Sequence, residues 1–221
     1  MSDDVVHAVR TRFDGRAPTY DSSAMHRDLA VAVAAFVDLT DVTTVLDVAT
    51  GTGLVLDALR TPEAPDAGAS ARTQERTLRR IGVDVSVGML AVARDRLPDA
   101  ELVEADARRL PLADGSVDLV TCVTGLHLIP DTALVLDEWV RVLRPGGRVV
   151  TATFAEFDPT QHHREVAGTD PAPYPLRHDP FRTPEALSAT VAPHGLHLLR
   201  HAHWTDGHDR LLLAELARIH P

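Results

Sequence analysis

The stretch VLDVATGTGLV, residues 45–55, decides the fold of this chain. It begins as an apolar run rich in β-branched residues, with an acid at Asp47. It then breaks at a Gly-Thr-Gly turn and resumes with the apolar spacing of a helix. This pattern predicts a strand, a tight turn and a helix. We expect a nucleotide-like ligand at the turn, because a side chain on Gly51 or Gly53 would occupy space that the ligand needs.

The composition predicts a single domain with small-molecule chemistry. The chain has 221 residues, is 44% hydrophobic, and carries 32 acidic against 22 basic residues. A chain of this length buries roughly 70% of its unfolded surface in one core. The formal charge of -10 and the absence of a basic run disfavour nucleic acid as a partner. No stretch approaches the ~18 apolar residues of a membrane span, so we expect no membrane insertion.

Several residue types are scarce, and their scarcity narrows the chemistry further. Cys122 is the only cysteine, so the chain has no intramolecular disulfide and fits a reducing cytoplasm. Lysine is absent, which excludes a Schiff-base lysine and a P-loop. Histidines are frequent after residue 160, but their spacing follows no zinc template, and we expect no metal site.

Strands and helices alternate along the middle of the chain. We expect strands at 44–48, 77–85, 101–105, 117–123 and 148–154, and helices at 53–60, 86–97 and 132–143. This alternation predicts a parallel sheet with helices on both faces, whose ligands lie beyond the carboxyl ends of the strands. A helix at 184–192 and strands at 196–204 and 210–219 follow, the strands as an antiparallel pair at the sheet edge.

The remaining segments frame this core. Residues 1–40 read as an N-terminal helical cap, with helices at 3–12 and 25–39 and a turn-prone stretch between them. Residues 41–221 form the main domain. It includes a surface insertion at 61–76, biased toward Pro, Ala and Gly, and a second insertion on the substrate side at 155–183.

Three acids stand at the ends of successive strands and identify the ligand more closely. They are Asp47, Asp84 and Asp106. An acid after the second strand can accept both hydroxyls of a ribose, and an acid after the third can accept from an adenine amino group. Each could alternatively be a solvated loop carboxylate or a helix cap. A dinucleotide fold would need a third glycine where this chain has Leu56.

Five motifs, taken in order, resemble the class I S-adenosylmethionine-dependent methyltransferases of the small-molecule, type 11 kind. They are VLDVATGTGLV, IGVDVSVGMLAVAR, VEADARRLPLADGSVDLVTC, LHLIPD and EWVRVLRPGGRVV. The resemblance covers residues 45–154. The upstream segment FDGRAPTYD resembles methyltransferases of quinone and biotin biosynthesis more loosely. The resemblance implies a Rossmann-like α/β fold with a mostly parallel seven-stranded sheet, helices on both faces and an antiparallel edge strand.

The resemblance also implies which residues bind S-adenosyl-L-methionine. Asp47 would organise the glycine turn near the methionine amine, Asp84 would hold the ribose, and Asp106 would read the adenine. The other implied cofactor-binding residues are Arg16, Tyr20, Ala49, Thr50, Gly51, Gly53, Val85, Met89, Ala107 and Thr124. Ala49 departs from the family pattern, since many members carry glycine there.

The expected reaction is transfer of the methyl group to an O, N or C atom of a small organic acceptor by in-line displacement. Positioning alone can supply much of the rate, and His127 is the candidate general base for an acceptor that must lose a proton. Two alternatives stay open at this stage. One is a non-catalytic protein that binds the cofactor or its product, and the other is a nicotinamide-dependent oxidoreductase. The sequence identifies neither the acceptor nor the oligomeric state.

Overall fold

The computed structural model describes residues 2–60, 78–155 and 174–218. The expected insertion at 61–76, and residues 156–173 of the one at 155–183, lie outside these ranges. The strands are β1 (Thr44–Val48), β2 (Arg79–Asp84), β3 (Glu101–Glu104), β4 (Val117–Val123), β5 (Leu143–Phe154), β6 (Leu196–Thr205) and β7 (Arg210–Arg218). The α-helices are α1 (Ser2–Arg16), α2 (Ala24–Phe36), α3 (Leu54–Ala58), α4 (Val87–Arg96), α5 (Thr132–Val142) and α7 (Pro184–Val191). The short 3-10 helices are η1 (Ala17–Ser22), η2 (Leu126–Leu128), η3 (Asp179–Phe181) and η4 (Ala192–His194).

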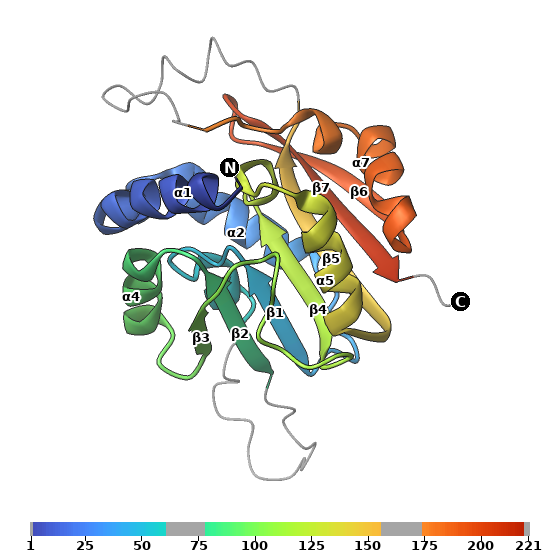
Figure 1. Cartoon of the computed structure of the whole chain (residues 1–221), viewed down its shortest axis with the longest axis horizontal. Coiled ribbons are helices and arrows are strands. Elements are labelled where there is room, and N and C mark those ends of the chain that lie inside the picture. Colours follow the sequence, from blue (N-terminus) through green and yellow to red (C-terminus); the bar gives the residue numbers. More distant parts are fainter. Residues whose placement is uncertain (1, 61–77, 156–173, 219–221) are drawn as a thin grey trace, which may run out of the picture.

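One seven-stranded sheet runs through the molecule in the order β3-β2-β1-β4-β5-β7-β6 (Figure 1). The pairs among β1 to β5 are parallel, and β7 is antiparallel to both of its neighbours. The predicted fold class is therefore confirmed. The structure adds that the antiparallel strand β7 is inserted between β5 and the edge strand β6.

The order of the strands locates the ligand site. The chain moves outward from β1 to β3 on one side, then crosses back to β4 on the other side of β1. β1 and β4 are neighbours whose connections run in opposite directions, and a crevice forms at the carboxyl ends of such strands. All five residues of β1 are buried, as expected for a central parallel strand covered on both faces.

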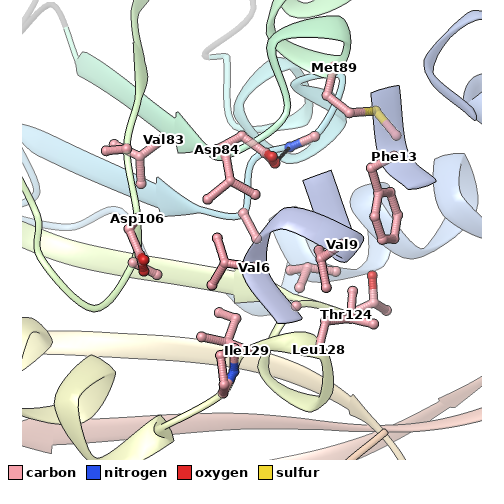
Figure 2. A pocket seen from close by; sticks show the side chains of 18 of the residues that line it. Val6, Val9, Phe13, Val83, Asp84, Met89, Asp106, Thr124, Leu128 and Ile129 are labelled. Carbon is pink, nitrogen blue, oxygen red and sulfur yellow. Dashed lines mark hydrogen bonds between the residues drawn. The ribbon is translucent and has the colours of Figure 1, made fainter. Parts of the chain in front are cut away.

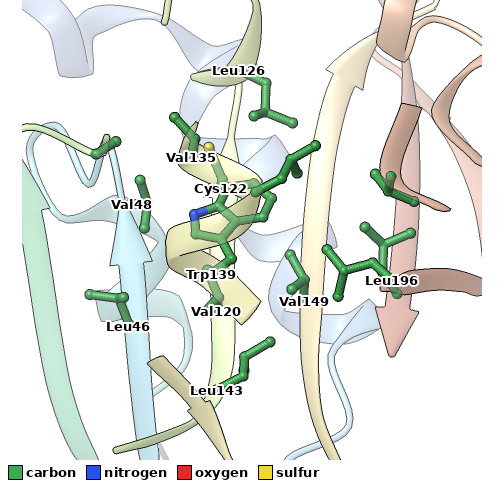
Figure 3. Close-up of a cluster of buried hydrophobic side chains, with 14 of the residues drawn as sticks. Leu46, Val48, Val120, Cys122, Leu126, Val135, Trp139, Leu143, Val149 and Leu196 are labelled. Carbon is green, nitrogen blue, oxygen red and sulfur yellow. The ribbon is translucent and has the colours of Figure 1, made fainter. Parts of the chain in front are cut away.

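Two apolar clusters cover the two faces of the sheet. One contains side chains of α5 and α7, including Trp139, which lies over β4 beside Cys122 (Figure 3). The other contains side chains of α2 and α3, including Leu29 and Val33. Helix α1 buries no residue fully and lies across the carboxyl ends of the strands (Figure 1).

Some boundaries differ from the sequence prediction because of tertiary contacts. α1 continues past residue 12 to Arg16, because Asp14 near its end accepts hydrogen bonds from Ser86 Oγ at 2.6 Å and Gly88 N at 2.8 Å. The predicted turn at 13–21 is therefore the last turn of α1 followed by η1. β5 begins at Leu143 rather than at residue 148, because Leu143 pairs with Val117 of β4.

A buried acid in β7 joins the sheet to the end of α2. Glu215 is 3% exposed and accepts from Arg148 Nη1 at 2.6 Å and from Arg200. Arg148 also donates to the backbone carbonyl of Asp38. Arg200 donates to the backbone carbonyl of Phe36, and the Arg200 guanidinium lies 4.2 Å from the centre of the Phe36 ring. The Glu215 carboxylate thus orients two arginines, and both arginines bind backbone carbonyls at the end of α2.

We predict that Glu215→Gln lowers the free energy of unfolding by about 2 kcal/mol, because it removes the buried charge that compensates Arg148 and Arg200. Chemical denaturation at neutral pH measures the change. Glu101→Gln is the control, since the Glu101–Arg79 pair is half-exposed and its loss should change stability by less than about 1 kcal/mol. Equal effects of the two substitutions would contradict the role given to Glu215.

Candidate cofactor site

Gly51 provides the open space that the sequence predicted at the glycine turn. Its φ is +56°, and a Cβ built on it would meet no atom within 4 Å. Gly53 has a different role. A Cβ there would lie 2.7 Å from Leu97 Cδ1 and 3.4 Å from the Cβ of Ala93. Gly53 therefore allows the turn to pack against α4, which corrects the expectation that it faces the ligand.

Two residues with unusual backbone conformations mark the crevice between β1 and β4. Ala49 follows β1 with φ +57°, and Thr124 follows β4 with φ +52°. A positive φ strains residues other than glycine, and such strain concentrates at functional sites. The conformation of Ala49 explains why glycine is common at this position in the family that the sequence resembles. A Cβ on Gly125 would lie 2.9 Å from the Cβ of Ala49, so the two turns approach closely.

Asp47 places a carboxyl group in the interior beside these turns. It is 1% exposed, and its Oδ1 accepts from Thr121 Oγ1 at 2.6 Å. Burial raises the pKa of Asp47 to about 6, while the hydroxyls of Thr121 and Thr50 oppose the shift. Among the described residues, neither Asp47 Oδ2 nor Thr50 Oγ1 has a hydrogen-bond partner of normal geometry. Such groups are expected to face a ligand that donates to them.

Asp84 is held rigidly at the end of β2. Its Oδ2 accepts from Gly51 N and its Oδ1 from Ser86 N, both at 2.8 Å. Burial raises the pKa of Asp84, and these backbone N–H groups oppose the shift. The acid thus connects the glycine turn to the start of α4, where the Ser86 hydroxyl caps the helix by accepting from Met89 N.

Asp106 is already bound by a neighbour. Both of its carboxylate oxygens accept from Arg108, the shortest contact being Nη2 to Oδ2 at 2.7 Å. The same guanidinium donates to Asp3 at the start of α1 and to Asp131 before α5. The sequence did not anticipate this ion pair. An adenine amino group would therefore share Asp106 with Arg108, which a carboxylate with two oxygens allows.

Two adjoining cavities lie above these residues. The larger encloses about 710 Å³ including its open mouth, and the smaller about 390 Å³. The larger is lined by Asp84, Val85, Met89, Asp106 and Ala107 on the sheet side and by Val6, Val9 and Phe13 of α1 (Figure 2). The smaller is lined by Asp47, Thr50 and His26. Both are lined by Tyr20, Ala49, Gly51, Val123 and Thr124.

Comparison with known proteins agrees with this geometry. Residues 46–151 match the family model described as a methyltransferase domain. Residues 46–151 form a methyltransferase domain. The matched residues run from β1 into β5 and include the three strand-end acids. The resemblance that the sequence motifs indicated is confirmed.

Relatives and solved structures extend this result. A demethylmenaquinone methyltransferase of Streptomyces griseus is 36% identical over 156 residues, which cover 68% of this chain and 62% of that protein. A Haloferax volcanii protein solved in complex with the Trm112 methyltransferase activator has a TM-score of 0.72 at 21% identity, covering 94% of this chain and 98% of its own. A Burkholderia thailandensis 1,6-didemethyltoxoflavin-N1-methyltransferase has a TM-score of 0.71 at 16% identity, and the match covers 100% of this chain and 91% of that protein's chain. The two structures establish the fold alone.

Helix α1, which precedes the matched residues, forms the roof of the larger cavity. Val6, Val9 and Phe13 lie on one face of the helix and point into the cavity (Figure 2). The sequence prediction missed them, although their spacing of three and four residues is the signal of an apolar helix face. Asp14 attaches one end of α1 to the start of α4, and Arg108 contacts Asp3 at the other end.

Tyr20 lies where the two cavities meet. The contact with the cofactor that the family resemblance implied for it stays a prediction. Burial raises the pKa of its hydroxyl to about 12, opposed by Arg16 and by a hydrogen bond with Thr124. Arg16 lines neither cavity. Its guanidinium lies 5.7 Å from the centre of the Tyr20 ring and 5.5 Å from that of Phe13. Arg16 therefore supports Tyr20 from outside the cavities.

His127 follows β4, as expected, but its side chain is turned into the interior. The ring stacks on His178 with centroids 4.4 Å apart and meets Phe154 edge-on at 5.4 Å. It is absent from the lining of both cavities, whereas its neighbours Gly125 and Leu128 are present. A general-base role for His127 stays a prediction, and the position of the ring does not favour it.

The described residues hold no group of three or more His, Cys, Asp or Glu side chains placed to bind a metal ion. No helix in the same ranges is long and apolar enough to cross a membrane.

We predict that Asp47→Asn stabilises the ligand-free protein by about 1–2 kcal/mol at pH 7.5. The pKa of Asp47 is raised to about 6 from 3.8. The penalty for burying its charge is therefore complete above pH 6, and it fades as the native state takes up a proton between pH 6 and 4. Denaturant unfolding at pH 7.5 and pH 4 should show a much smaller gain at the lower pH.

Asp118→Asn is the matched control. Asp118 accepts from the backbone N of Thr43 and Thr44, both at 2.9 Å, and its pKa is lowered by those bonds against the opposing effect of burial. Its replacement should destabilise the protein at neutral pH. A loss of stability for Asp47→Asn at pH 7.5 would show that its carboxylate is already satisfied.

Proposed function

We propose that this protein transfers the methyl group of S-adenosyl-L-methionine to a small organic acceptor. The observation that supports this most is that the two cavities meet at Tyr20, Gly51 and Thr124. Asp84 and Asp106 line the larger cavity, and Asp47 lines the smaller one. The chain spans about 62% of the length of the curated relative described above.

The larger cavity suits the adenosine part of the cofactor. Asp84 would accept from the ribose hydroxyls, since its carboxylate lines the cavity and is oriented by Gly51 and Ser86. Val85 and Met89 supply apolar walls for a planar base. Asp106 and the Ala107 amide are the candidates for reading the adenine edge. The smaller cavity suits the methionine part, because Asp47 and Thr50 line it and, among the described residues, their Oδ2 and Oγ1 have no hydrogen-bond partner of normal geometry.

The bound cofactor supplies a methyl group on a positively charged sulfur, which a nucleophile can take in one displacement. The protein then needs no covalent intermediate of its own. Tyr20 and Thr124 orient the reacting groups where the cavities meet, and α1 excludes water by covering the larger cavity. Holding two reactants in line can contribute about 7–11 kcal/mol to lowering the barrier.

For the acceptor we propose a hydroxylated aromatic compound of the quinol type. The proposal is supported by the relative named demethylmenaquinone methyltransferase and by the apolar lining from α1 together with Leu128, Ile129 and Pro130. Residues 1–40 would act as the cap that selects this acceptor, and the segment after β5 would contribute on the same side. A cytoplasmic location stays a prediction from the sequence.

We predict that calorimetry shows binding of S-adenosylmethionine and S-adenosylhomocysteine, and that Asp84→Asn weakens both at least tenfold through loss of the charged ribose contacts. Asp99→Asn serves as the control, because Asp99 follows α4 and lines neither cavity. Binding of NADH with no binding of either sulfur compound would favour an oxidoreductase instead.

We further predict that the protein methylates a demethylated naphthoquinol in the presence of S-adenosylmethionine. Mass spectrometry of the acceptor detects the gain of one methyl group, and Asp84→Asn should reduce this rate at subsaturating cofactor. Stoichiometric cofactor binding without transfer to a panel of quinols, phenols and amines would instead support a non-catalytic binding protein.

A further inference from the structure

The smaller cavity contains one titratable side chain whose role the proposed function leaves open. His26 lies in the first turn of α2 and lines this cavity together with Asp47, Thr50 and Thr124. It is half-buried and belongs to the N-terminal region rather than to the segment that matches the methyltransferase family. Its contacts determine which of its ring nitrogens is available.

Two contacts fix the His26 ring. It stacks on Tyr20 with centroids 4.1 Å apart and an interplanar angle of 10°. Its Nδ1 lies 3.3 Å from the carbonyl oxygen of Tyr20. A carbonyl can only accept, so Nδ1 carries the hydrogen, and in the neutral ring Nε2 keeps its lone pair. Burial lowers the pKa of His26, which favours this neutral form.

The smaller cavity therefore offers two groups that only accept, the neutral His26 Nε2 and the Asp47 carboxylate, beside a Thr50 hydroxyl that can also accept. In the described part of the chain, Asp47 Oδ2 and Thr50 Oγ1 have no hydrogen-bond partner of normal geometry, and their residues are 1% and 6% exposed. A primary ammonium carries three N–H donors and a positive charge, which match such a set. A carboxylate has no hydrogen to donate and would be repelled by Asp47.

We propose that His26 is a positioning residue that accepts a hydrogen bond from the ammonium of the cofactor's amino-acid end, opposite Asp47. This inference rests on the proposed function and adds a residue of the N-terminal cap to the methionine side of the site. Because the His26 ring also stacks on Tyr20, it would fix the position of Tyr20 relative to the amino-acid end of the cofactor.

Three ligands separate this role from general support of the site. The three ligands share the adenosine part and differ in the groups of the amino-acid end. S-adenosylhomocysteine has both the amine and the carboxylate. Decarboxylated S-adenosylmethionine has the amine without the carboxylate, and 5′-methylthioadenosine has neither group. We expect His26→Leu to weaken the first two by about tenfold in calorimetry and to leave the third within twofold. His26→Gln places an acceptor near the position of Nε2 and should restore most of the affinity. His26→Asn is too short to do so and should behave like His26→Leu.

His197→Leu is the matched control, because His197 is exposed on β6 and lines neither cavity. Thermal unfolding checks that each variant is folded. If His26→Leu does not fold, the comparison of His26→Gln with His26→Asn still tests the inference. Equal losses for all three ligands, or no loss, would overturn the inference. A loss confined to S-adenosylhomocysteine would assign His26 to the carboxylate and overturn it as well. Failure of the unaltered protein to bind any of the three would instead overturn the proposed function, and this inference with it.

Discussion

The site depends on a buried carboxylate between two neighbouring strands. Asp47 ends β1 and is bound by Thr121 of β4, which places an acid with a raised pKa beside the turns of Ala49 and Thr124. A buried charge without full compensation destabilises a protein unless a ligand completes its hydrogen bonds. The interior of this domain is thus arranged for a partner that donates hydrogen bonds and carries positive charge.

The cap covers part of this crevice. α1 contributes an apolar face over the larger cavity, and η1 and α2 bring Tyr20 and His26 over the junction and the smaller cavity. The cap is fastened to the elements that carry the site: Asp14 binds the start of α4, and Arg108 joins Asp3 to Asp106. Cap position and ligand contacts are therefore physically coupled through the same carboxylates.

The fold explains cofactor chemistry better than acceptor chemistry. Structures only 16% and 21% identical superimpose with TM-scores of 0.71 and 0.72, because the packing of a doubly wound sheet tolerates wide variation in sequence. The strand-end acids lie on this shared framework. The residues that would meet an acceptor lie on the cap and on loops, where local sequence rather than topology decides shape and polarity.

Local patterns in the sequence were sufficient for the strands, the glycine turn and the three acids, because hydrophobic periodicity and turn residues report on the chain within a few positions. The role of Tyr20 beside the cofactor was implied by the family resemblance and not by a local pattern. Only the tertiary structure showed that Gly53 packs against α4, that Asp106 is bound by Arg108, and that His127 turns inward onto His178. Each of these depends on residues brought together from different elements, and no local pattern encodes which side of a turn a side chain will face.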